Sequence, residues 1–144
     1  MLQRRLLAIV AAGGLAVAAP VALAASKNGL TPVAPKAGAT LPVGKSPTFK
    51  VRSSGDGTVW LHICKSAKKN AKGVICYQGK NGGTIAQMRK KGGVYQVTPK
   101  FFDYPGFWAN RAGTWYWQAH RIACENGDTS DCLQEGPVVK IRLR

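Results

Sequence analysis

The side chains with most scope for chemistry are two histidines and a small set of acids. His62 and His120 each lie in a stretch rich in aromatic and β-branched residues, and paired imidazoles can ligate a metal or transfer protons. Glu135, together with His120 and Arg121, has the residue types for acid–base cleavage of RNA, with the arginine on the phosphate. Three further acids in the range 125–131 offer oxygen ligands suited to Ca²⁺. Each hypothesis requires the fold to bring these residues together.

The four cysteines suit disulfides better than a metal centre. They are Cys64, Cys76, Cys124 and Cys132, and their spacings contain no CxxC pair and do not match a zinc ribbon. Four cysteines allow three pairings, and disulfides form in oxidising compartments. The chain also has no Gly-x-Ser-x-Gly, HExxH or phosphate-loop motif. We therefore predict two disulfides, no metal, no cofactor and no enzymatic activity.

The first 24 residues have the features of an export signal. Arg4 and Arg5 precede a long apolar run that ends at Ala22-Leu23-Ala24, a small-x-small cleavage motif. An uncleaved membrane anchor is the alternative, but Pro20 interrupts the run, which is rich in Ala and Gly. We predict a secreted or cell-envelope protein without a membrane span after cleavage. Its parts are a signal peptide at 1–24, a polar leader at 25–29 and one domain at 30–144.

The chain is strongly basic. It has 21 Lys and Arg against 6 Asp and Glu, and the net charge is still +13 once residues 1–24 are removed. Such an excess attracts polyanions such as nucleic acid, anionic headgroups or acidic wall polymers, although it also simply aids solubility. One concentration of charge is the loop Lys65–Gly73, to which Arg89, Lys90 and Lys91 can add. Its cations are Lys65, Lys68, Lys69 and Lys72. Because no aromatic residue interleaves with them, the loop favours point-charge attraction over base stacking; the alternative is an ordinary solvated loop.

About seven short strands are expected to position these residues. They are Leu30–Leu41 with its two prolines, Pro47–Arg52, Thr58–Cys64, Val74–Tyr77, Gly93–Thr98, Gly113–Cys124 and Pro137–Arg144. Turn residues separate them, and no amphipathic helix is evident; the segment Thr84–Lys91 suits either a helical turn or a strand. This pattern predicts an all-β, antiparallel sandwich.

Alternation along two of these strands separates a core face from an outer face. Trp115, Trp117 and Ala119 share one side of their strand, and Val59, Leu61 and Ile63 share one side of theirs. These six are expected in the core. The opposite side carries Trp60, His62, Tyr116, Gln118 and His120. This outer face suits sugar rings or a peptide, unless a neighbouring segment such as Lys100–Ala112 covers it.

Four segments within residues 30–144 match a known family in order and type. In chain order, the segments are Pro35-Lys-Ala-Gly-Ala-Thr, Pro47-Thr-Phe-Lys-Val, Ala112-Gly-Thr-Trp-Tyr-Trp-Gln-Ala and Glu135-Gly-Pro-Val-Val-Lys-Ile-Arg-Leu. They resemble the first, second, penultimate and last strands of fibronectin type III and related immunoglobulin-like modules of bacterial secreted proteins. The resemblance implies an immunoglobulin-like fold and a role in binding or spacing, not catalysis. The chain departs from the family at Trp115, where a corner tyrosine is common. Because an indole can donate but not accept, the corner hydrogen bond must differ or be absent.

The topology that the resemblance implies makes Thr58–Cys64 and Gly113–Cys124 antiparallel neighbours. Cys64 and Cys124 then lie roughly 20 Å apart, beyond the ~7 Å Cα limit for a disulfide. The local pairs Cys64–Cys76 and Cys124–Cys132 are therefore expected. With Cys64 beside Thr114, the two histidines lie roughly 13 Å apart, too far for shared ligation, and both are expected on the sheet surface.

These inferences predict a secreted, non-enzymatic β-sandwich binding module that engages an anionic cell-envelope or extracellular polymer through basic loops. The alternative is a secreted protease inhibitor that presents the Lys65–Gly73 loop, whose lysines suit trypsin-like proteases. A third hypothesis is a secreted nuclease or other hydrolase that depends on His120.

Overall fold

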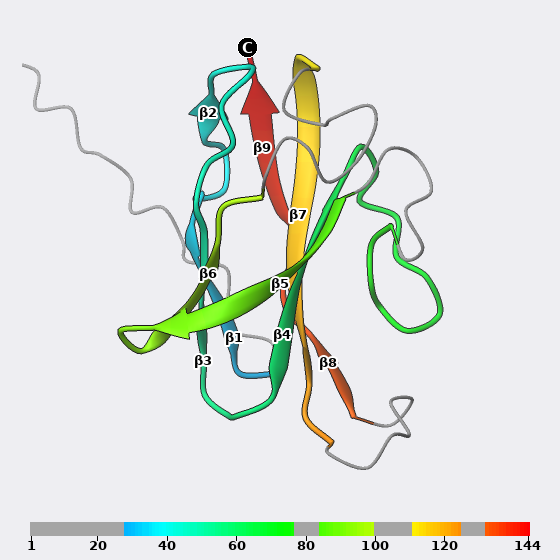
Figure 1. Ribbon diagram of the computed structural model, residues 1–144. Helices are drawn as coiled ribbons and strands as arrows, with labels where there is room; N and C mark the ends of the chain where they lie inside the picture. Colours follow the sequence, from blue (N-terminus) through cyan, green and yellow to red (C-terminus); the bar gives the residue numbers. More distant parts are fainter. Residues whose placement is uncertain (1–27, 77–83, 100–110, 125–131) are drawn as a thin grey trace, which may run out of the picture.

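The computed structural model of the chain is all-β (Figure 1). It describes residues 28–76, 84–99, 111–124 and 132–144, and these ranges contain strands but no helix. Within them, accordingly, no helix has the length and apolarity to cross a membrane. The predicted signal peptide, most of the polar leader, residues 100–110 of the aromatic link and the acids of 125–131 lie outside the described residues.

The strands form one mixed sheet in the order β1-β3-β6-β5-β4-β7-β9-β2, with β8 paired to β7. Their bounds are β1 (Leu30–Ala34), β2 (Thr40–Leu41), β3 (Phe49–Ser53), β4 (Thr58–Cys64), β5 (Thr84–Lys91), β6 (Val94–Val97), β7 (Gly113–Ile122), β8 (Leu133–Glu135) and β9 (Val139–Leu143). The all-β prediction is confirmed. The expectation of antiparallel pairing throughout is wrong for β2 and β9, which are parallel.

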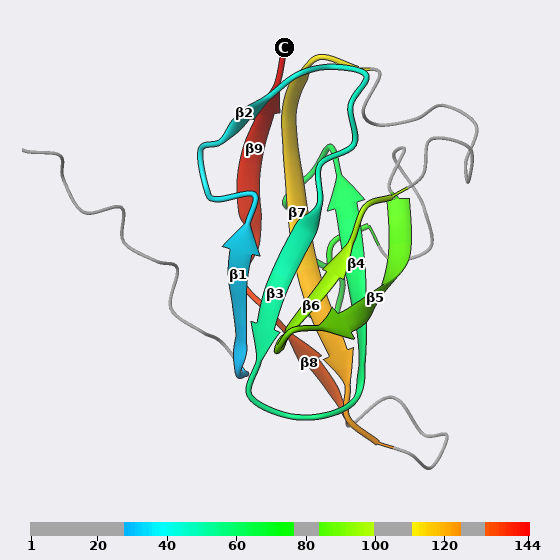
Figure 2. The ribbon, with the colours of Figure 1, turned by 60° about the vertical axis from the view of Figure 1, so that its left-hand side comes forward.

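The parallel pair arises because the first expected strand divides in two. Pro35 has no N–H to donate, and Gly38 has a φ of +78°, so the chain leaves β1 and turns here. β1 pairs with β3, whereas β2 pairs with β9 at the other end of the strand order. Only residues 35–39 join these two edge strands, a span of at most about 20 Å when extended. The sheet must therefore curl until its edges approach each other (Figure 2).

Inward-facing side chains of the curled sheet form one core. All six residues that alternation assigned to the core are buried: Val59, Leu61 and Ile63 from β4, and Trp115, Trp117 and Ala119 from β7. Phe49 of β3 packs edge-on against Trp117, with ring centroids 5.4 Å apart. Because three strands separate β3 from β7 in the sheet, this contact shows that the sheet curls over its own core.

The segment Thr84–Lys91, which the sequence did not decide, is the strand on which the curl depends. Its first part pairs with β4, up to Met88 opposite Val59, and its last three residues pair with β6. β5 therefore continues from one half of the curled sheet into the other. The strand expected at Val74–Tyr77 is reduced, within the described residues, to a single bridge between Lys69 and Ile75.

Candidate functional site

The outer face of β4 and β7 is largely covered. Of its five candidate binding residues, His62, Gln118 and His120 are only 1%, 0% and 5% exposed, while Trp60 and Tyr116 are half-buried. The described segment that covers it is the loop after β4, whose Val74 and Ile75 are themselves fully buried. The expectation that His62 and His120 lie on an exposed sheet surface is therefore wrong, because this loop folds back over them.

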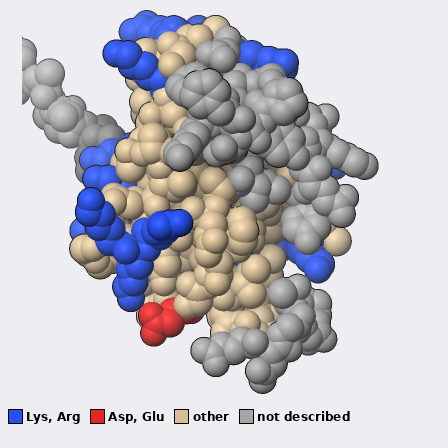
Figure 3. Space-filling model, viewed as in Figure 1, with Lys and Arg blue, Asp and Glu red and all other residues tan. Residues whose placement is uncertain are grey.

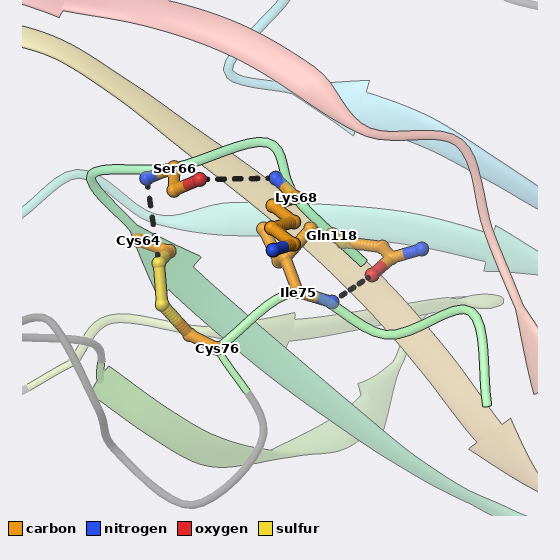
Figure 4. Close-up of a disulfide and its surroundings, with 6 residues drawn as sticks. All are labelled: Cys64, Ser66, Lys68, Ile75, Cys76 and Gln118. Atoms are coloured by element: carbon orange, nitrogen blue, oxygen red, sulfur yellow. Dashed lines mark hydrogen bonds between the residues drawn. A yellow bond between two sulfur atoms is a disulfide. The ribbon is translucent and has the colours of Figure 1, made fainter. Parts of the chain in front are cut away.

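Gln118 holds the covering loop to the sheet. Its Oε1 accepts a hydrogen bond from the backbone N–H of Ile75 at 3.0 Å (Figure 4). Its Nε2 donates to the carbonyl oxygens of Gly73 at 3.0 Å and of Gly136 at 2.9 Å. A side chain that alternation placed on an open binding face is thus a buried clamp between β7, the loop and the segment after β8.

The two histidines are close together, and the predicted separation of about 13 Å is wrong. Their ring centroids are 4.6 Å apart. Cys64 faces Tyr116 in the register, not Thr114, so His62 faces Gln118 and His120 is only two residues further along β7. Side chains of such diagonal neighbours can meet across two strands. Among the described residues, however, no third His, Cys, Asp or Glu completes a metal-binding group.

Burial keeps this histidine pair neutral at pH 7. Loss of hydration lowers the pKa of His62 to about 3 and that of His120 to about 4. The neighbouring His120 lowers the pKa of His62 further, while the nearby backbone of Ile75 raises it to a smaller extent. Both nitrogens of His62 and Nδ1 of His120 are buried, and none of these three atoms has a hydrogen-bond partner among the residues that the structure describes. The pair is thus sensitive to acid.

The set of Glu135, His120 and Arg121 does not converge on one point. Glu135 of β8 lies directly opposite His120, and its carboxylate accepts a hydrogen bond from Asn28 Nδ2 at 3.2 Å. Arg121 is the next residue along β7, so it projects from the opposite face. There its guanidinium donates to Gln134 Oε1 and to Ser53 Oγ. The hydrogen bonds of Arg121 therefore link β3 to β8.

Both disulfides join the local pairs that were expected. The Cα atoms of Cys64 and Cys76 are 5.8 Å apart, and those of Cys124 and Cys132 are 5.5 Å apart. No free cysteine is present in the chain. Two disulfides fit an oxidising environment.

The basic loop is tethered and internally braced. The Cys64–Cys76 disulfide closes it, and Asn70 Oδ1 accepts hydrogen bonds from the N–H groups of Lys72 at 2.9 Å and Val74 at 3.0 Å. Lys65 lies 4.1 Å above the centre of the Trp115 ring, and its ammonium donates to the carbonyl of Ala112. The remaining three lysines of the loop, Lys68, Lys69 and Lys72, are exposed.

A second basic surface lies at the other end of β5. It is a groove of about 540 Å³, called here the basic groove, lined by Thr48, Lys50, Arg89, Lys90, Lys91, Gln96, Val97 and Thr98. The groove uses strands β3, β6 and β5, which are adjacent in the sheet but not all consecutive in the sequence. Sequence patterns pointed to the three cations of β5 but missed Lys50, because only the pairing of β3 with β6 brings it here.

The cations of the basic groove are largely uncompensated. Lys90 pairs with Asp56 at 3.4 Å, an exposed contact of little energetic weight. In the ranges that the structure describes, Lys50, Arg89 and Lys91 take part in no ion pair. Figure 3 shows Lys and Arg gathered where β5 meets β6, and again near the C terminus.

The basic groove and the basic loop are separate surfaces. Thr84, at the start of β5, lies opposite Ile63, close to where the loop begins, whereas Arg89 and Lys91 pair with β6. An eight-residue strand is about 25 Å long, so the two charge clusters lie at opposite ends of β5. The expectation that Arg89, Lys90 and Lys91 would add to the basic loop is wrong.

Comparison with known proteins adds no family to this description. No family description matches the chain, nor does any curated protein or solved structure. The fibronectin type III resemblance stays a prediction from sequence pattern, and the function must be inferred from geometry and charge.

Proposed function

We propose that this protein is a secreted, non-enzymatic binding module for an anionic polymer of the cell envelope or extracellular space. The observation that carries the proposal is the basic groove, where Lys50, Arg89 and Lys91 surround a polar floor and no carboxylate of the described residues neutralises them. Cations kept close together without partners repel one another, and a polyanion relieves that repulsion. The high net charge, +13 without residues 1–24, draws such a polymer to the protein.

We propose further that the curled sheet is a variant of the immunoglobulin-like sandwich, and two contacts support this. The two halves of the curled sheet pack through contacts such as Phe49 on Trp117. Trp115 Nε1 donates a 2.9 Å hydrogen bond to the carbonyl of Arg111, four residues upstream. The hydroxyl of a corner tyrosine likewise bonds to the backbone a few residues upstream, so an indole can fill the same role. Export by the 1–24 segment would bring the disulfides into an oxidising compartment.

Retention on an immobilised anionic polymer at rising salt tests the proposal. A variant with Lys50, Arg89 and Lys91 all changed to Gln is expected to elute at clearly lower salt, because each lost contact releases about one counterion fewer. The matched control changes Lys36, Lys45 and Arg142 to Gln; these cations are exposed and outside the groove. Equal losses in the two variants would show that total charge, not the groove, retains the polymer.

The braced basic loop favours one second function, inhibition of a trypsin-like protease. A bound loop resists turnover when both sides of the cleavage point are held, and here the disulfide, Asn70 and Gln118 hold the loop. The exposed side chains of Lys68, Lys69 and Lys72 suit the acidic specificity pocket of such enzymes. A protease panel with the intact protein tests this function. Rapid cleavage within residues 65–73, without inhibition, rules it out.

A further inference from the structure

We infer that the basic groove selects tetrahedral oxyanions, the sulfate or phosphate esters of an extended glycan, over carboxylates. The inference rests on the proposed function and adds the chemical class of its ligand. It depends on how the strands place hydrogen-bond donors relative to one another, and not on the amount of charge alone.

The central feature is a row of three donors across three strands. Lys50 of β3 and Arg89 of β5 both face Gln96 of β6 in the register, so all three side chains project from the same face. Adjacent strands are about 4.8 Å apart, so the two cations begin about 10 Å apart with the amide between them. Their long side chains can close on a group held above Gln96, whose NH₂ adds donors from below.

Further donors lie two residues away along the strands, on either side of this row. Thr48 and Thr98 share a hydrogen bond of 2.7 Å between their hydroxyls. One hydroxyl donates in this bond, which leaves the hydrogen of the other available to a ligand. In the other direction, Lys91 follows Arg89 on the same face of β5, about 6.6 Å further on. The groove thus offers successive cationic positions to a chain with repeated charges.

This donor arrangement fits an ester oxyanion better than a carboxylate. A carboxylate presents two oxygens in one plane, whereas a sulfate or phosphate ester presents additional oxygens out of that plane. Lys50 and Arg89 approach from two sides and Gln96 from a third, so the extra oxygens find donors. The guanidinium fork of Arg89 can bind two ester oxygens at once, as it can the two of a carboxylate, so the selectivity rests on the additional ester oxygens that Lys50 and Gln96 can reach.

The described lining of the groove offers no surface for stacking bases. Single-stranded nucleic acids are held by stacking on aromatic side chains, and none of the described residues that line the groove is aromatic. Tyr95, which is also in β6, is buried on the inner side of the sheet, where its hydroxyl donates a 3.3 Å hydrogen bond to the carbonyl of Gly57. This favours a sugar polymer over a single-stranded nucleic acid as the carrier of the charged group.

Direct titration of the intact, disulfide-bonded protein with chain-length-matched probes tests this inference. The probes are a sulfated oligosaccharide, a phosphorylated one, a polyuronate of equal charge density and a DNA oligonucleotide, all at the same ionic strength. We expect at least one ester probe to bind about tenfold or more tightly than the polyuronate and the DNA. The tighter of the two ester probes identifies which ester is the source of the oxyanion.

Two variants and a matched control assign the selectivity to the row. Changing Lys50 and Arg89 together to Gln is expected to weaken ester binding about tenfold. The control, Lys36 and Arg142 to Gln, removes the same charge from other exposed positions and should change ester binding much less. Arg89→Lys keeps the charge but removes the fork, which binds carboxylates as well as esters, so it should weaken both kinds of probe and leave the preference for esters, which rests on the additional oxygens, largely in place.

The outcomes separate this inference from the function on which it rests. Equal binding of polyuronate and esters overturns the oxyanion selectivity but leaves a polyanion-binding module. Tighter binding of DNA overturns the choice of a glycan. Equal weakening in the control overturns the assignment to the row. Absence of binding to every probe overturns the proposed function itself.

Discussion

Acidification is expected to destabilise the fold through the buried pair of His62 and His120. Their folded-state pKa values, about 3 and about 4, lie below the 6.5 of an ordinary histidine. As the pH falls, the unfolded chain therefore binds protons before the folded chain does. The contribution of the pair to stability is complete above about pH 6.5 and is lost progressively between that pH and the folded-state pKa values.

The structure sets the size of this effect. A pH of 5 is about 1.5 units below the pKa of an unfolded histidine. Each imidazole that stays buried and neutral at this pH therefore lowers the free energy of unfolding by about 2 kcal/mol, and the pair lowers it by about 4 kcal/mol. Glu135 is the acid that faces the pair from β8, and its carboxylate is engaged by Asn28. Gln118 and the covering residues of the loop carry no charge. The expected loss is a large fraction of the stability of a typical domain, which is about 5–15 kcal/mol.

Urea denaturation at pH 7.5 and pH 5 measures this loss as a difference in the free energy of unfolding. The wild type should lose about 4 kcal/mol, each of His62→Gln and His120→Gln about half of that, and the double variant less than about 1 kcal/mol. The chain contains only six acids, which limits other acid-driven losses. If the double variant loses as much as the wild type between the two pH values, the histidines are not the cause.

Three further changes test the packing that surrounds the candidate surfaces. Gln118→Leu leaves three main-chain groups buried without partners and should lower the free energy of unfolding by about 3–5 kcal/mol; a loss below about 1 kcal/mol would contradict the clamp. Trp115→Phe should cost about 1–2 kcal/mol more than Trp117→Phe in chemical denaturation, because both are fully buried but, of the two, only the Trp115 indole N–H has a hydrogen-bond partner among the described residues; equal costs would argue against that bond. Replacing Cys64 and Cys76 with Ala should cost about 2–3 kcal/mol, visible as a lower Tm, and an unchanged Tm would mean that the disulfide does not restrain the unfolded chain.

Local alternation was sufficient to predict which residues fill the core. Trp115 and Trp117 in one strand, and Leu61 in its neighbour, are inward because side chains alternate in any extended strand. The antiparallel pairing of these strands was also foreseen, and with it the local disulfides. Such features depend on a few consecutive residues or on the order of the strands.

Alternation could not predict the register between strands or the contacts between segments that are far apart in the sequence. A slip of two residues keeps every side chain on its own face, so alternation cannot distinguish Tyr116 from Thr114 as the partner of Cys64. This slip of two residues, together with the way diagonal side chains lean towards each other, explains why the histidine rings are neighbours although the predicted separation was about 13 Å. The basic groove could not be predicted for a similar reason, because Lys50 lies near Arg89 only through the intervening strand β6.

The short edge strands of the curled sheet have a consequence for self-association. A β-protein aggregates when a long, regular edge accepts a strand from a second molecule. Here β1 is interrupted by Pro32, which has no N–H to offer, and by an irregular register before Ala34. At the opposite edge β2 has only two residues, and β8 beside β7 has three. These three edge strands are thus too short or too irregular to template a strand of a second molecule, which disfavours fibril formation through them.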